Sequence, residues 1–217
     1  MPEVEVLVQR LVAVAVIILV AFPVHEFSHA FAAYRLGDST ARYQGRLTLN
    51  PITHFDPVGG TILALSALLG GFFIGWAKPT PVNPYNLRGG RRSEALVALA
   101  GPISNLVLAA IVAIPLRIIL ASPEMRLAIG SSDIAVFVLG VVETFMVINI
   151  ILMIFNLLPI PPLDGWHALL GVVNARMAYT LRQYEQYGFI LIILLIITGA
   201  PFLRGLVDFI RRILLGI

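Results

Sequence analysis

Long runs of apolar residues, separated by short polar connections, make up most of this chain. Four of the runs are each close to the roughly 20 residues that an α-helix needs to cross a bilayer. The pattern predicts an all-α, polytopic membrane protein with spans at about residues 6–24, 95–120, 134–158 and 187–203. The first run has no basic cluster before it, so we expect a retained membrane helix rather than a secretory signal.

A fifth apolar run, at residues 58–77, carries five glycines. We predict that it is a re-entrant segment, which enters and leaves the membrane by one face. The alternative is that this run crosses the membrane completely. In either case we expect about four to six membrane segments in total.

The polar connection at residues 41–51 (ARYQGRLTLNP) alternates around Gly45, a pattern typical of a short β-hairpin after the first helix. Because an open sheet edge is not tolerated against lipid, the hairpin should lie at the interface or against protein. No repeat and no long polar stretch divides the chain, so residues 1–217 are expected to form a single membrane-embedded domain.

Composition supports lipid as the main solvent, since 59% of the residues are hydrophobic and only 12% are charged. The net charge is +3, but the arginines are scattered over short loops, so nucleic acid is not an expected partner. The chain has no cysteine, which excludes disulfides, a thiol nucleophile and a cysteine-ligated zinc. A metal site here must use His, Asp and Glu.

The strongest chemical signal is the motif HEFSH at residues 25–29. Residues four apart share one face of a helix, so His25 and His29 can reach one ion while Glu26 lies beside an attacking water. The context argues against a chance match, because ionisable residues at the end of a membrane helix are costly to bury and usually have a function. Hydrolytic zinc sites typically use three protein ligands, so one ligand is still missing.

Asp164 is the favoured third ligand. It follows the third span in NLLPIPPLDG, where prolines interrupt a regular helix and can turn a carboxylate inward. Its alternative role is a helix N-cap. Glu143, inside the 134–158 span, is a rival ligand that could instead pair with a neighbouring helix, and His167 could be a spare ligand or a plain polar residue.

Three motifs in this order resemble the site-2 protease family of intramembrane zinc metalloproteases: HEFSH (25–29), AGPISNLVLA (100–109) and NLLPIPPLDG (156–165). Two more are similar to the small members that have neither a PDZ nor a CBS domain: NPITHFDPVGG (50–60) and GWAKPTPVNP (75–84). The resemblance implies regulated intramembrane proteolysis, with peptide bonds hydrolysed in or near transmembrane segments of truncated single-span proteins.

The resemblance also implies one Zn²⁺ per chain, with three ligands and one general base: His25, His29, Asp164 and Glu26. It places Asn105 and Asn156 near the site, holding a substrate strand or stabilising the oxyanion. His54 is a further candidate, at the mouth of the site or beside the metal ligands, whereas Asp56 before Pro57 also suits an ordinary turn.

Charge and the proposed ligands agree on one topology. Asp164 can meet the histidines only if the first and third spans end on the same side, which requires residues 58–77 to re-enter. Loop 35–57 holds three basic residues and loop 78–93 holds four, against two in the 117–133 connection. The positive-inside rule then predicts a cytoplasmic-membrane protein whose active site opens toward the cytoplasm. The C-terminal arginines fit this rule only if that tail lies in the membrane interface or folds back.

A transmembrane substrate hides its backbone in internal hydrogen bonds, so we expect a locally unwound substrate to add as a strand to the 41–51 hairpin. Two other functions stay open. One is a membrane zinc protease in which Glu143 is the third ligand, and the other is a non-enzymatic transporter or scaffold, against which the intact HEFSH argues. The sequence does not determine the oligomeric state.

Overall fold

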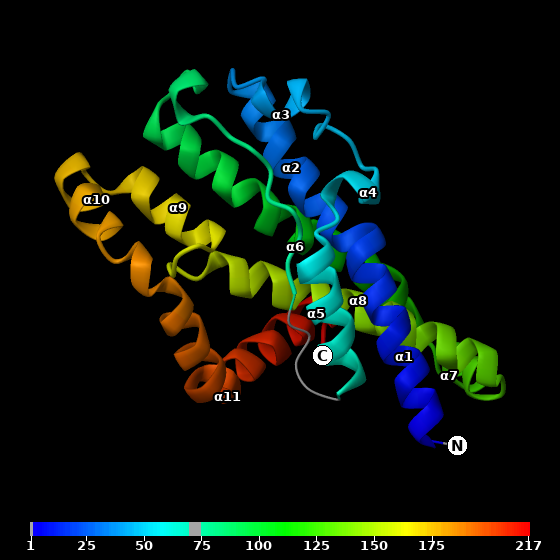
Figure 1. Cartoon of the computed structure of the whole chain (residues 1–217). Coiled ribbons are helices and arrows are strands. Elements are labelled where there is room, and N and C mark those ends of the chain that lie inside the picture. The colour runs from blue at the N-terminus through cyan, green and yellow to red at the C-terminus, as the bar shows by residue number, and fades with distance from the viewer. Residues whose placement is uncertain (1, 70–74) are drawn as a thin grey trace.

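The computed structural model describes residues 2–69 and 75–217, and these residues form helices and loops without any β-strand (Figure 1). Four helical stretches are long and apolar enough to cross a membrane: Val6–Arg35, Arg91–Ala121, Asp133–Leu157 and Glu185–Leu215. They coincide with the four predicted spans, so the chain is an integral membrane protein with a mostly helical fold.

The first span is one continuous rod built from three elements: α1 (Pro2–Val16), the π-helical turn η1 (Ile17–Ala21) and α2 (Phe22–Arg35). The wider turn comes just before Pro23, which has no N–H and whose ring crowds the carbonyl four residues earlier. Single π-helical turns of this kind are frequent at functional sites. Here the turn directly precedes the helix that carries the HEFSH motif.

Three short helices follow: α3 (Thr40–Tyr43), α4 (Pro51–His54) and α5 (Pro57–Leu68). The predicted β-hairpin at 41–51 is therefore wrong. Gly45, at φ +67°, ends the first helical turn, and Asn50 accepts a hydrogen bond from the Ile52 amide to cap the next turn. The pattern misled because the burial is the reverse of what a strand needs: the polar Arg46 is buried, whereas the apolar side chains of Tyr43 and Leu49 are 86% and 54% exposed.

The segment 58–77 returns to its own starting point. Helix α5 has 12 residues, fewer than a span needs, and residues 70–74 lie outside the described part of the chain. Residues 75–83 are extended, and we call them the strap. The Lys78 amide donates a 2.9 Å hydrogen bond to the His54 carbonyl, so the two ends of the segment are adjacent, as a re-entrant path requires.

The rest of the chain contains two short 3₁₀ turns and six helices: η2 (Pro84–Asn86), α6 (Arg91–Ala121), α7 (Pro123–Gly130), α8 (Asp133–Leu157), α9 (Asp164–Val172), α10 (Ala175–Arg182), η3 (Glu185–Tyr187) and α11 (Gly188–Leu215). Helix α6 is the centre of the fold, because it packs against α2, α8 and α9. Small residues buried along it allow these helices to approach closely: Ala95, Ala98, Gly101, Ala109 and Ala113.

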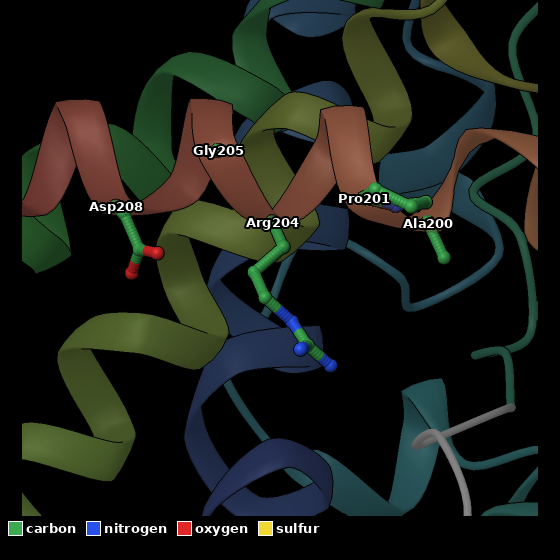
Figure 2. A pocket seen from close by; sticks show the side chains of 5 residues that line it. All are labelled: Ala200, Pro201, Arg204, Gly205 and Asp208. Carbon is green, nitrogen blue, oxygen red and sulfur yellow. The ribbon is translucent and has the colours of Figure 1, made fainter.

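Helix α11 bends sharply partway along its length (Figure 1), and it contains Pro201, a usual cause of such kinks. Its second half packs on α6 and α8, so the arginines near the C-terminus belong to this helix and not to a separate interfacial segment. Arg211 pairs there with Glu143 of α8. Figure 2 shows Arg204 and Asp208 on one side of α11, lining a shallow pocket beside the kink.

Because the strap lies close to α5, we expect a larger residue at Gly59 to reduce the stability of the protein. A Cβ on Gly59 would lie 2.2 Å from the Trp76 carbonyl oxygen, a backbone atom that cannot rotate away. We expect Gly59→Ala to destabilise the protein by about 1–3 kcal/mol through this overpacking. Thermal unfolding in detergent measures the effect, with Gly130→Ala as control because nothing lies within 4 Å of its Cβ. Equal midpoints for the two variants would mean that the strap does not pack against α5.

Candidate active site

Two histidines of α2 point at the same position. His25 and His29 are four residues apart on a regular helix, and their Nε2 atoms lie 3.1 Å from each other. Both side chains are buried, at 8% and 7% exposure. The helical spacing read from the sequence therefore places the two imidazoles as expected.

Asp164, from a distant part of the chain, lies next to both histidines. Its Oδ2 lies 3.1 Å from His25 Nε2 and 3.3 Å from His29 Nε2. Asp164 is the first residue of α9, where no side-chain capping hydrogen bond is present, so the alternative role as an N-cap does not apply. Among the described residues, these three side chains form a group able to hold a metal ion, and the group includes neither Glu143 nor His167.

The outer nitrogen of each imidazole is already engaged. His25 Nδ1 lies 2.6 Å from Asn105 Oδ1, and His29 Nδ1 lies 2.8 Å from the Val97 carbonyl, both on α6. Because both partners are acceptors, each Nδ1 carries the proton and each Nε2 presents a lone pair. Metal-ligating histidines are usually oriented in this way by a partner on the other ring nitrogen.

Three electron-pair donors thus converge without a proton between them. Asp164 Oδ2 is buried and has no hydrogen-bond partner, although two imidazole nitrogens lie close by. Buried polar atoms in such an arrangement repel one another unless a cation lies among them. Two histidines and one carboxylate are a ligand set that zinc takes in hydrolytic sites, so the residues fit this metal.

Gly101 of α6 keeps space open at the same point. A Cβ there would lie 2.3 Å from His29 Nε2 and 2.6 Å from His25 Nε2. Any other residue would therefore place an atom where the histidine lone pairs meet. This explains in physical terms why a glycine stands in the AGPISN stretch.

Asn105 is fully buried and links His25 to helix α8 by a second hydrogen bond. Its Nδ2 donates to Asn149 Oδ1 at 2.9 Å, and Asn149 Nδ2 donates to the Phe145 carbonyl of its own helix. Sequence reasoning missed Asn149. The available signal was an asparagine in the middle of an apolar span, where polar side chains are expensive.

Two other candidates have local partners. Asn156 donates to the Leu152 carbonyl one turn earlier on α8, and His54 Nε2 lies 2.7 Å from the Thr48 carbonyl. In the described part of the chain neither is hydrogen-bonded to the three ligand-type side chains. Their proximity to a substrate stays a prediction.

Glu26 is half-buried beside the histidines and is held by the strap. The Thr80 amide donates a 2.7 Å hydrogen bond to Glu26 Oε2, and the Thr80 hydroxyl donates to the Glu26 carbonyl at 3.0 Å. Nothing in the sequence singles out Thr80, because it lies in a proline-rich stretch whose pattern indicates a turn. Its contact with Glu26 exists only because the strap folds back over α2.

Comparison with known proteins agrees with this geometry. Residues 12–199 match the model of Peptidase family M50. The chain belongs to this family, the site-2 proteases. It is therefore a membrane zinc metalloprotease, and no solved structure matches it.

Three curated proteins are similar to most of the chain. A Bacillus subtilis protein named "Putative zinc metalloprotease YwhC" is 43% identical over 184 residues, covering 83% of this chain and 78% of that protein. Rip2, a protein of the same descriptive name, is 35% identical in Mycolicibacterium smegmatis and 33% identical in Mycobacterium tuberculosis strain H37Rv. These two matches cover 84% and 86% of this chain, and 65% and 66% of the Rip2 proteins.

The space left by Gly101 makes a prediction about zinc in this M50 protein. Gly101→Ala should abolish or strongly weaken zinc binding, because the new methyl group would occupy the position between the two Nε2 atoms. Elemental analysis of the purified protein measures the bound zinc. Gly140→Ala is the control, since Gly140 also lies in an apolar membrane helix but its Cβ would meet only Gln9 Nε2 at 3.7 Å. A full complement of zinc in Gly101→Ala would place the metal elsewhere.

Proposed function

We propose that this zinc metalloprotease hydrolyses peptide bonds in or near transmembrane segments of membrane proteins, as a step of regulated intramembrane proteolysis. The observation that carries the proposal is the position of the candidate ligands, on or next to helices that can span a membrane. Two of them lie on the stretch Val6–Arg35, which is apolar and long enough to span a bilayer, and the third begins α9 soon after the end of α8. A scissile bond reaching this site must come to the membrane.

The proposed roles follow the geometry of the site. His25, His29 and Asp164 hold zinc, and Glu26 is the general base. When bound, zinc supplies a Lewis acid that polarises the scissile carbonyl and acidifies a water molecule. Glu26 takes a proton from the attacking water and delivers it to the leaving amine. Asn105 orients His25, and Asn149 orients Asn105 in turn.

A metal site using Glu143 is less well supported. The Glu143 carboxylate pairs with Arg211 on α11, and it lies outside the group of three side chains that can share an ion. This ion pair is the role expected for a carboxylate that links two membrane helices. The proton-accepting Glu26 beside the histidines likewise favours an enzyme over a transporter or scaffold.

The proposed topology has the site opening toward the cytoplasm from the cytoplasmic membrane. Support comes from the adjacent ends of segment 58–77, joined by the Lys78–His54 hydrogen bond, and from the excess of basic residues in the flanking loops. Residues 1–217 then act as a single membrane-embedded domain whose partners are the lipid bilayer and a transmembrane protein substrate.

The catalytic assignment is tested by two substitutions in the purified protein. We expect Glu26→Gln to retain zinc but to lose about 100-fold or more of its cleavage of a labelled single-span peptide, because the base is removed and the ligands remain. Asp164→Ala should lose zinc and cleavage together. Asp208→Asn, on the distant part of α11, is the control and should keep both. Full zinc in Asp164→Ala would show that the third ligand is another residue.

The re-entrant topology is tested by cysteine labelling, which is simple because the chain has no cysteine. Single cysteines replacing Gln44 and Tyr85 should both react with an impermeant maleimide from the cytoplasmic side. A cysteine replacing Leu127, which is 76% exposed on α7, should react from the outside. Labelling of positions 44 and 85 from opposite sides would mean that residues 58–77 cross the membrane.

A further inference from the structure

Arg46 is a buried arginine whose hydrogen bonds go to the backbone. Only 5% of the residue is exposed, and its guanidinium donates to the carbonyl oxygens of Thr53, Lys78 and Pro79. Burying a guanidinium costs desolvation free energy, and hydrogen bonds to carbonyl groups offset that free energy less fully than a carboxylate does. The arginine therefore points to a structural requirement at the groups that it holds, and two of these belong to the strap.

The backbone N–H of the strap that contacts Glu26 lies between two prolines. Residues 78–81 read Lys-Pro-Thr-Pro, and proline has no N–H, so Thr80 alone can donate between the two prolines. The fixed φ of each proline also stiffens the segment. Once Arg46 holds the carbonyls of residues 78 and 79, the direction of the next amide is nearly determined.

A second anchor lies on the other side of Thr80. The Asp38 carboxylate is fully buried and accepts a 2.7 Å hydrogen bond from the Asn83 amide and a 2.9 Å bond from the Asn86 side chain. Burial raises the pKa of this carboxyl, but the hydrogen bonds, including those from Thr40, outweigh burial and hold the pKa below its usual range. The strap is thus fastened at residues 78–79 and again at residue 83.

Between these anchors, the Thr80 amide binds one oxygen of Glu26. A carboxylate acting as a base needs one oxygen for the proton, and a hydrogen bond to the other oxygen fixes the orientation of the group. Orientation of a reacting group is worth much in rate, since a misplacement of about 1 Å can cost on the order of 100-fold. Because Thr80 engages Oε2, the proposed proton acceptor is Oε1.

We propose that Arg46 is a positioning residue for the general base: by holding the strap at Lys78 and Pro79, it aims the Thr80 amide at Glu26. The inference rests on the proposed function, because it assumes that Glu26 is the base. It assigns to Arg46 a role in the catalytic step and none in binding zinc.

The first test compares Arg46→Met with Arg42→Met in cleavage of a labelled single-span peptide. Arg42 is the matched control, because it lies four residues before Arg46, is exposed, and bonds the Tyr34 hydroxyl instead of the strap. We expect Arg46→Met to lower kcat by about 10- to 100-fold with KM and zinc content nearly unchanged. Arg46→Lys should recover only part of the loss, since a single ammonium cannot replace the planar fork. An Arg46→Met enzyme as active as Arg42→Met would overturn the proposal, and so would one that is more active than the unmodified enzyme.

A double substitution separates positioning from a general loss of structure. In Glu26→Asp the carboxylate is one methylene shorter and no longer reaches Thr80, so adding Arg46→Met should lower kcat by less than 3-fold further, roughly the level expected when two changes act through one group. A further loss as large as the one in the unmodified enzyme would show that Arg46 acts through something other than the Thr80–Glu26 hydrogen bond, such as its charge, and would overturn the proposal.

A third measurement does not depend on activity. Ala77 of the strap is half-buried and lies next to Lys78, away from the anchor at Asn83, so Ala77→Cys should react slowly with a maleimide in detergent. Adding Arg46→Met should raise the labelling rate several-fold, whereas adding Arg42→Met should not. Equal rates would mean that Arg46 does not hold the strap. If the unmodified enzyme cleaves no single-span peptide, the proposed function fails, and the labelling rates still decide whether Arg46 holds the strap.

Discussion

Two imidazole nitrogens that face each other at 3.1 Å, both with lone pairs inward, are the constraint on which this structure depends. Helix α6 meets that constraint in two ways. It engages both outer nitrogens, through Asn105 and the Val97 carbonyl, and it leaves space in front of them at Gly101. The close packing of α6 against α2, made possible by small residues, is therefore part of the candidate metal centre and not merely of the fold.

The candidate ligands and the candidate base are positioned by different parts of the molecule. The histidines are fixed from inside the membrane, where Asn149 of α8 supports Asn105. Glu26 is fixed from the loop side, by Thr80 of the strap. This division follows from helical geometry, because residues 25 and 29 share one face of α2 whereas residue 26 points about 100° away.

Two polar contacts elsewhere link the apolar helices to one another. Glu143 pairs with Arg211, which ties α8 to the second half of α11. Arg10 of α1 donates to the Ala67 carbonyl near the end of α5, where the helix leaves carbonyls without partners. A cation at that end also interacts favourably with the helix dipole. These contacts hold the outer elements around the central helix.

The sequence by itself determined the membrane helices and the local part of the site. Length and hydropathy are enough to define a span, and a spacing of four on a helix is enough to bring His25 and His29 together. The pattern failed at residues 41–51, because the distant strap buries the polar Arg46 and leaves the apolar Tyr43 and Leu49 exposed, which a local pattern does not show. The contributions of Asn149 and Thr80 were decided by tertiary structure alone, since a hydrogen bond between residues 44 or 54 positions apart depends on how helices and loops pack, which no local pattern encodes.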